Sequence, residues 1–472
     1  MLHLDQYDKG VWRTRASARA ASLLAKWLPC ITLLGGIVAF IVILVRDPTQ
    51  ESLVSGDESY TKVSEGLGAA FLLTAAALML SWAAPYIMTE SGRLTYDRVR
   101  TVTYALPPKG PKGVAIVAML ASDLVLQPCL MFVNRHVAHG STLQAAASYM
   151  LFSSSPYVSP KNFLHPPANA TAVFAIPFAF MFLIAILTAA VGLCAIVPTY
   201  AYPGSAADKK PVLQMTAYGG LTLTMSWWLY RLLSVFPCNP PYMNSHGKKL
   251  VNATMYGDPT LECLGTGHSV YMTMSLVEIV ILGLATLSGI QQLRLLDHTF
   301  DAFEIYAIRA DPLCLAAGTA ARSAVLICSG MQLNATVTLL VVLGTNVVHF
   351  TASMLWKYSS VHSINTFAKV VAALNLFSAG CMTILLAGTS QGYASLTGHH
   401  SSGGELQDFG DTSMVVGVGV CWLVVEIVVV VAFVIFHRRH YKGQWFDDGS
   451  GIAPPGVGSP LEGLRSEDIR LA

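Results

Sequence analysis

Residues 413–436 read SMVVGVGVCWLVVEIVVVVAFVIF, in which Glu426 is the only charged side chain, and the basic sequence HRRH follows at 437–440. The hydrocarbon core of a membrane is about 30 Å thick, so a helix crosses it with about 20 apolar residues. Lys and Arg gather at the cytosolic ends of such helices. The stretch therefore predicts a transmembrane helix whose C-terminal end lies in the cytosol.

Nine more stretches with few charges precede this one. They span residues 28–46, 66–88, 112–132, 171–198, 212–235, 268–290, 313–331, 335–356 and 367–389. Stretch 313–331 is the weakest, because its residues are small and Arg322 lies near its middle. It is a span of its own, a re-entrant segment, or one half of a long tilted helix that continues into the next stretch. We predict ten spans, with nine as the alternative.

The composition also indicates a membrane protein. The 472 residues are 53% hydrophobic and 12% charged, whereas soluble proteins carry about 25% charged residues. We therefore predict an all-α integral membrane protein. It is a polytopic bundle of transmembrane helices over residues 28–436 with short extramembrane loops, and its main partner is the lipid bilayer. The net charge is only +2 and the 29 Lys and Arg are spread over many loops, so no nucleic-acid partner is expected.

The positions of Lys and Arg orient the chain. In a ten-helix topology that starts in the cytosol, Lys209, Lys210 and the HRRH cluster at 437–440 all fall on the cytosolic side, where positive charges near helix ends are enriched. With nine helices the last cluster would lie outside. Segments 1–27 and 437–472 are then both cytosolic. The second is expected to be largely disordered, because it is rich in Gly, Pro and Ser.

Three segments are outer loops in this topology, at 133–170, 236–267 and 390–412. The second has Cys238 and Cys263 near its ends and the sequon Asn252-Ala253-Thr254 between them. Two cysteines in one such loop predict a disulfide in an oxidising compartment. Asn252 is the predicted glycosylation site because it lies far from both flanking helices. These features predict the plasma membrane or an endomembrane of the secretory pathway.

Charged side chains within the predicted spans are the candidate functional residues. They are Asp123 in the third span, Glu278 in the sixth, Arg322 in the seventh and Glu426 in the tenth. Such residues cost about 2.5 to 3.5 kcal/mol each at a helix centre and usually face a bundle interior or a wet cavity. They could converge to bind a small solute, a cation or a proton. Alternatively, the carboxylates pair with Arg322 and only hold the helices in register.

Motifs of soluble enzymes are not found. The sequence contains no P-loop, dinucleotide-binding fingerprint, nucleophile elbow or HExxH sequence. We therefore predict no catalytic residue, no metal site and no cofactor. A membrane enzyme with an unfamiliar site would need His or Asp near one membrane face, for which His349, His362, Asp297 and His298 are the candidates.

Two functions fit these patterns. The first is a transporter or permease for a small solute, with coupling to protons through the intramembrane carboxylates. The second is a receptor, sensor or scaffold that does not transport and that binds a partner through outer loops 133–170 and 236–267. A transporter needs its polar groups to line one shared path, whereas a receptor or scaffold needs ordered outer loops.

Overall fold

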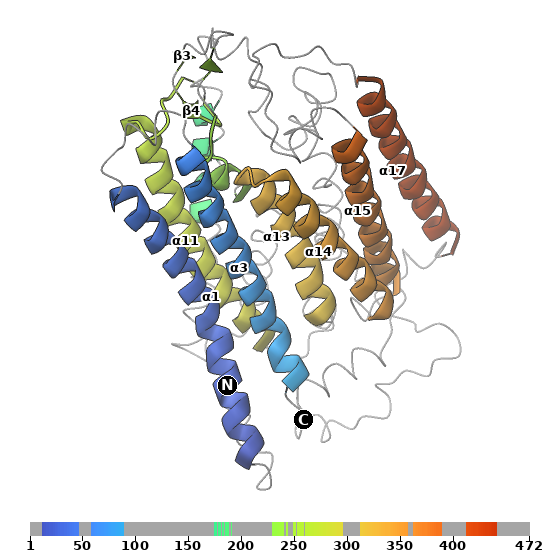
Figure 1. Ribbon diagram of the computed structural model, residues 1–472. Coiled ribbons are helices and arrows are strands. Elements are labelled where there is room, and N and C mark those ends of the chain that lie inside the picture. Colours follow the sequence, from blue (N-terminus) through green and yellow to red (C-terminus); the bar gives the residue numbers. More distant parts are fainter. Residues whose placement is uncertain are drawn as a thin grey trace.

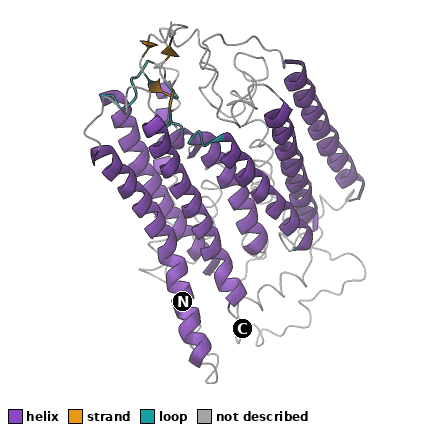
Figure 2. Ribbon diagram, viewed as in Figure 1, coloured by secondary structure: helices purple, strands orange, loops and turns teal. Residues whose placement is uncertain are grey.

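The fold is known from a computed structural model, in which residues 12–46, 58–88, parts of 174–190, 229–239, 242–243, 249–251, 253–258, 260–295, 312–356, 362–388 and 412–440 are described. Helices dominate these residues, and the strands are four short segments (Figure 2). The helical class of the fold is therefore confirmed. Asp123, Asn252 and outer loops 133–170 and 390–412 lie outside the described residues.

Seven long helices make up most of the described chain. They are α1 (Trp12–Arg46), α3 (Glu58–Met88), α11 (Thr266–Leu295), α13 (Pro312–Gly330), α14 (Ala335–Leu355), α15 (His362–Gly388) and α17 (Thr412–His440). Each packs on the next in a series, with α1 against α11 and α3, then α3 against α13, α13 against α14, α14 against α15 and α15 against α17. In Figure 1, α1 and α11 lie on the left and α17 on the right.

Within the described residues, five stretches of helix are long and apolar enough to cross a membrane: Trp27–Val45, Lys62–Leu80, Ala335–Leu355, Asn365–Gly388 and Val416–Arg439. They coincide with the first, second, eighth, ninth and tenth predicted spans. Helices α11 and α13 occupy the sixth and seventh predicted positions but are not among the five. The third predicted span is not described, and the fourth and fifth are described only in part. The count of ten therefore stays a prediction.

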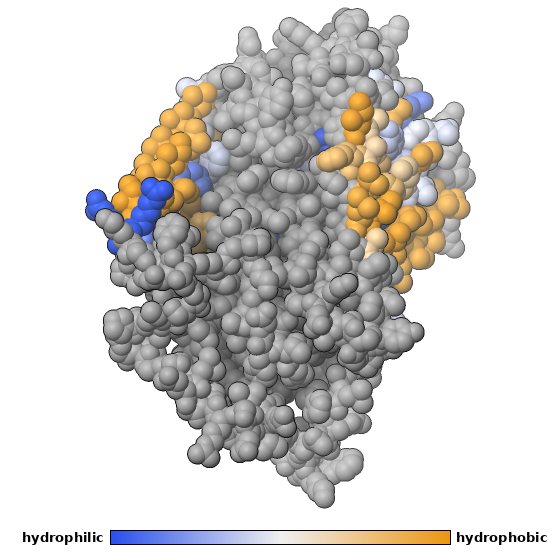
Figure 3. Space-filling model, turned by 180° about the vertical axis from the view of Figure 1, so that it is seen from behind, coloured by the Kyte–Doolittle hydropathy of each residue, from blue (hydrophilic) through white to orange (hydrophobic). Residues whose placement is uncertain are grey.

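The outward faces of these helices are apolar. Large apolar residues of α1, such as Ile31 and Val38, and of α17, such as Val424 and Val428, are each about half exposed or more. In Figure 3 the residues coloured as hydrophobic gather along both flanks of the molecule. A soluble bundle would bury these side chains, whereas a bilayer accommodates them.

A tight turn separates α13 from α14. Gln332 has a positive φ of 55°, and the amide of Leu333 donates to the carbonyl of Cys328 at 3.1 Å, as in a Schellman motif at a helix C-terminus. The next residue, Asn334, caps α14 by accepting a hydrogen bond from the amide of Thr336 at 2.9 Å. These contacts reverse the chain, so the alternative of one long helix over both stretches is not what the structure shows.

Helices α1 and α3 pack closely, because a glycine of α1 faces a small residue of α3. A β-carbon added at Gly36 would lie too close to the β-carbon of Ala70, whereas one at Gly35 would meet nothing within 4 Å. One turn after Gly36 along α1, on the side of the strands, the two helices share an aromatic cluster. The ring of Phe236 lies 6.0 Å from that of Phe40 and 6.2 Å from that of Phe71, measured between centroids.

The four strands lie at one end of the helices (Figure 1), within segment 236–267, which the predicted topology places on the outer side. Strand β1 (Cys238–Asn239) pairs antiparallel with β4 (Thr254–Met255), and Cys238 lies opposite Met255. Strand β2 (Tyr242–Met243) pairs antiparallel with β3 (Lys249–Val251), and the register shifts between Tyr242 and Met243. We call the described residues from Phe236 to Gly265 the outer cap.

The close contact between α1 and α3 predicts an asymmetric effect of two neighbouring substitutions. Gly36→Leu should lower stability by about 1 to 3 kcal/mol, because the added side chain overpacks the interface with Ala70. Gly35→Leu is the matched control and should have little effect. The melting temperature of the purified protein in detergent, followed by scanning fluorimetry, checks this. Equal melting temperatures for the two variants would contradict the packing described here.

Candidate functional site

Three of the four charged residues predicted within the spans are described, and these three do not gather at one point. Glu278 lies on α11, where it is 1% exposed, Arg322 lies half-buried on α13, and Glu426 lies partly buried on α17. Helices α11 and α17 stand on opposite sides of the molecule in Figure 1, with α13, α14 and α15 between them. The structure therefore does not bring Glu278 and Glu426 together.

A different set of polar side chains lies between the central helices. On α14 the buried residues recur every three or four positions, at Thr338, Val342, Asn346, His349 and Ser353. Most of the exposed residues of the same helix are apolar, among them Leu340, Val347, Val348 and Leu355. A helix on the surface of a soluble protein has the opposite arrangement. Helix α14 thus turns its amide, imidazole and hydroxyl groups toward its neighbours.

The imidazole of His349 lies against a glycine of α13. A β-carbon at Gly318 would be 3.1 Å from Nε2 of His349, so a larger residue at 318 would require the ring to move. One turn away the Sγ of Cys314 donates a hydrogen bond of 3.2 Å to the carbonyl of Ala352. These two contacts establish that α13 and α14 run antiparallel in close contact.

This pairing places Arg322 near the polar face of α14. Arg322 follows Gly318 by one helical turn, and Asn346 precedes His349 by just under one turn. Because the helices are antiparallel, both steps lead in the same direction along the bundle. Arg322 and Asn346 therefore lie at about the same level, one turn from the contact between Gly318 and His349.

Helix α15 adds polar residues on the other side of α14. Asn365, Asn375 and Ser378 are buried, and Oδ1 of Asn375 has no hydrogen-bond partner among the described residues. Helix α15 also packs against α17, which carries Glu426. Arg322, the polar face of α14, the amides of α15 and Glu426 thus belong to four consecutive helices that pack in series.

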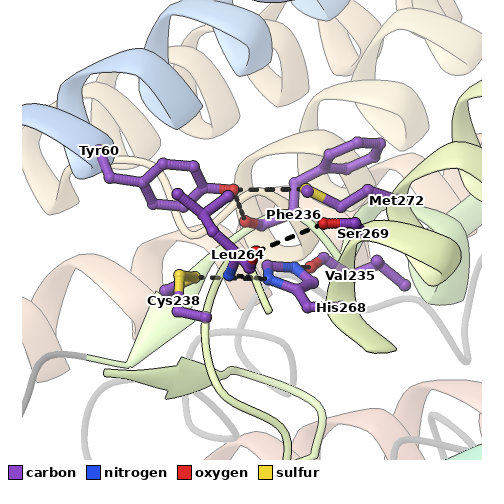
Figure 4. Close-up of a disulfide and its surroundings, with 9 residues drawn as sticks. Tyr60, Val235, Phe236, Cys238, Leu264, His268, Ser269 and Met272 are labelled. Carbon is purple, nitrogen blue, oxygen red and sulfur yellow. Dashed lines mark hydrogen bonds between the residues drawn. A yellow bond between two sulfur atoms is a disulfide. The ribbon is translucent and has the colours of Figure 1, made fainter. Parts of the chain in front are cut away.

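The outer cap is joined to the helices by a second group of residues (Figure 4). The sulfur atoms of Cys238 and Cys263 lie at bonding distance, with their α-carbons 5.9 Å apart, so the predicted cysteine pair is brought together. The hydroxyl of Tyr60, near the start of α3, donates to the carbonyl of Phe236 at 2.8 Å. Burial raises the pKa of Tyr60 well above its usual value, which keeps this donor neutral.

His268 fixes the start of α11 against the same cap. Its Nδ1 accepts a hydrogen bond of 2.9 Å from the amide of Leu264. Its Nε2 must therefore carry the proton, and it donates to the carbonyl of Val235 at 2.7 Å. Leu264 has a positive φ of 60°, a backbone conformation that is rare for a bulky residue. The hydrogen bond that the amide of Leu264 donates to His268 helps to hold Leu264 in this conformation.

The cysteine pair and His268 resemble a metal site by distance alone. Their ligand atoms lie within 4.8 Å of one another. Zinc needs thiolate sulfur and a ring nitrogen with a free lone pair. In this structure the two sulfurs are bonded to each other, and Nδ1 of His268 already accepts a hydrogen bond. The group is therefore a structural clamp rather than a metal centre.

Sequence analysis named His349 as a candidate residue of a membrane enzyme, but it gave the polar face of α14 as a whole no role, because only charged residues within the spans were taken as candidate functional residues. Asn346 and Asn375 are amides and His349 is an imidazole, and such residues also occur at lipid-facing or loop positions. A usable signal was the recurrence of polar residues at 338, 346, 349 and 353 between Val and Leu positions. The contacts of His268 with Leu264 and Val235 left no comparable pattern in the sequence.

Comparison with known proteins adds no functional assignment. No protein-family model matches the chain, and searches of characterised proteins and of solved structures find no match. The polar face of α14 and the outer cap are therefore the features that bear on function.

The two hydrogen bonds of His268 predict a large effect of its removal. His268→Ala leaves the buried amide of Leu264 and the carbonyl of Val235 without partners, which should lower the stability by roughly 2 to 4 kcal/mol. Ser269→Ala is the control on the next residue, since its hydroxyl makes only a long contact of 3.4 Å. The melting temperature measures both. Incubation with EDTA should leave the wild-type value unchanged, and a drop would indicate a bound metal.

Proposed function

We propose that the chain is a multi-pass membrane permease for a small solute, whose path follows the polar face of α14 between α13 and α15. One observation carries the proposal. Helices long and apolar enough to span a membrane expose Val and Leu and bury Asn, His and Ser. Polar groups inside a membrane are costly, and they are typical of substrate and ion pathways.

The hydrogen bonds of α14 favour a solute path at its polar face rather than a set of polar contacts that only fix the helices to one another. Thr345 donates to the carbonyls of Val341 and Val342, and Nδ2 of Asn346 also donates to Val342, at 2.8 Å. These bonds lie within α14 itself. A polar residue whose role is to fix two helices together donates across the interface. Thr345 and Asn346 satisfy part of their hydrogen-bonding capacity locally, and the amide retains further capacity for a solute.

Coupling to protons remains part of the proposal. Glu426 lies on the face of α17 that packs against α15, one turn after the buried Trp422. A carboxylic acid between apolar helices can exchange a proton without a permanent charge in the membrane. Glu426 is therefore the best-placed described group for a coupling role. Glu278, on the opposite side of the molecule, is better suited to a structural role in α11.

The second candidate, a receptor or scaffold, is favoured by one specific observation. The outer cap is closed by the cysteine pair, and Tyr60 and His268 fasten it to α3 and α11. An ordered outer loop of this kind could present a binding surface to a partner. In that case the polar face of α14 would be closed to water, and this difference separates the two functions.

Accessibility to a water-soluble reagent tests the permease. The background is a chain that retains Cys238 and Cys263 but has its other seven cysteines replaced by serine. In this background, Asn346→Cys and Ser353→Cys should react with a membrane-impermeant methanethiosulfonate in proteoliposomes. Leu340→Cys and Val347→Cys are matched controls on the exposed apolar face of the same helix and should not react, because lipid excludes the reagent. Absence of reaction at both 346 and 353 would leave the receptor or scaffold as the better candidate.

A further inference from the structure

Helix α17 carries the least covered of the five apolar stretches. Only 11% of Val416–Arg439 is buried, compared with 56% of Asn365–Gly388 on α15. Among the described helices, α15 is its main neighbour. Most of the surface of α17 therefore faces outward, where a membrane protein meets lipid.

One side of α17 is fixed to α15 near its C-terminal end. The ring of Phe433 lies 5.2 Å from that of Phe367 on α15, measured between centroids. The ring of His437, one turn after Phe433, lies 5.5 Å from the Phe433 ring. The side of α17 that carries Phe433 and His437 is thus the side that faces α15.

Two arginines lie at this end of α17, away from α15. An α-helix turns by about 100° per residue, so Arg438 is about 140° and Arg439 about 240° around the helix from Phe433. Both arginines are exposed. Their guanidinium groups are therefore presented on the outward side of α17, on the far side of the helix from the aromatic contact.

An exposed apolar stripe leads along α17 to each arginine. Residues three or four apart lie on one face of a helix, so Ile427, Val431, Val434 and Arg438 share a face. From 427 to 438 the helix rises about 16 Å, which is about half of a hydrocarbon core of about 30 Å. The second stripe, which ends at Arg439, consists of Val424, Val428 and Ile435.

The surface view agrees with this arrangement. The six apolar residues of the two stripes are 45% to 58% exposed. Figure 3 shows the molecule from behind, so α17, on the right in Figure 1, lies on the left. There an apolar strip ends in hydrophilic residues. Apolar surface and positive charge thus meet at the end of α17.

This end of α17 has the charge that an anionic membrane surface attracts. The sequence HRRH at 437–440 is followed by Lys442, and residues 427–446 contain no Asp or Glu. The predicted topology places this end in the cytosol, where the adjacent leaflet is rich in anionic lipids. Arginine also presents several N–H donors in a planar fork that suits phosphate oxygens.

We propose that Arg438, Arg439 and the two stripes form a binding site for an anionic phospholipid in the leaflet at which α17 ends. The headgroup binds the two guanidinium groups, and an acyl chain lies along a stripe. A second protein helix would cover the apolar stripes equally well, but the two charges at their end favour a lipid. This inference goes beyond the permease and does not depend on it.

A fluorescent probe beside the stripes tests the site. Val430→Cys, in the background that retains Cys238 and Cys263, is labelled with bimane and placed in lipid nanodiscs. Quenching by phosphatidylserine with a nitroxide on its acyl chain is compared with quenching by phosphatidylcholine with the same nitroxide, at equal mole fractions. The apparent binding constant of phosphatidylserine should exceed that of phosphatidylcholine by about fivefold or more, the order expected for basic residues at an anionic surface.

A second probe position and two double variants are the controls. Leu340→Cys lies on the exposed face of α14, a helix without Lys or Arg, and should show a ratio of the two binding constants near one. Arg438→Gln combined with Arg439→Gln should lower the ratio at position 430 to near one. Arg438→Lys combined with Arg439→Lys keeps the charge and should retain most of the preference.

Several results would overturn the proposal. They are equal binding of the two lipids at position 430, an equal preference for phosphatidylserine at 430 and 340, and a preference unchanged in the double Gln variant. Weak quenching by both lipids at 430 would mean that protein covers the stripes, which also contradicts a lipid site. The comparison of positions 430 and 340 uses the native arginines, so it holds even if the double Gln variant does not fold.

Discussion

The apolar outward faces of the helices are the constraint on which the other features depend. Helices α1, α14 and α17 expose many Val, Leu and Ile side chains, so their buried polar side chains lie between helices. Buried polar groups need partners, because an unsatisfied one costs about 1 to 3 kcal/mol. Two arrangements occur among the described residues. Small residues such as Gly36 allow close apolar contact, and elsewhere polar side chains such as Asn346 and His349 are buried between helices.

The outer cap provides a fixed end for this arrangement. Tyr60 connects α3 to the carbonyl of Phe236, and His268 connects α11 to Val235. The Phe236 ring in turn lies beside rings of α1 and α3. The segment at Val235 and Phe236 therefore contacts α1, α3 and α11. The cysteine pair closes the loop that follows, so the three helices are held together at the end where the strands lie.

The sequence predicted local features well, whereas the roles of its candidate site residues stay predictions. The run at 413–436 lies within α17, the stretches at 313–331 and 335–356 agree with α13 and α14 to within a residue, and Cys238 meets Cys263. These depend on hydropathy, on the turn at 331–334 and on cysteine position, which are all local signals. Whether Glu278 and Glu426 lie close together in space depends on which helices are neighbours. The order of packing is set by contacts such as Gly318 with His349, and no single stretch encodes it.

The position of Arg322 between two close contacts bears on how a solute could pass. On one side, one turn away, Gly318 lies against His349. On the other, two turns away, a β-carbon at Gly330 would lie 2.6 Å from that of Leu233, so α13 is also tightly packed at its C-terminal end. Both contacts use glycine, which lets backbones approach and leaves no side chain to interlock. In the proposed permease, a solute at the level of Arg322 would have to pass one of these contacts to leave. Opening them in turn, while the outer cap holds α1, α3 and α11, would give access from one side of the membrane at a time.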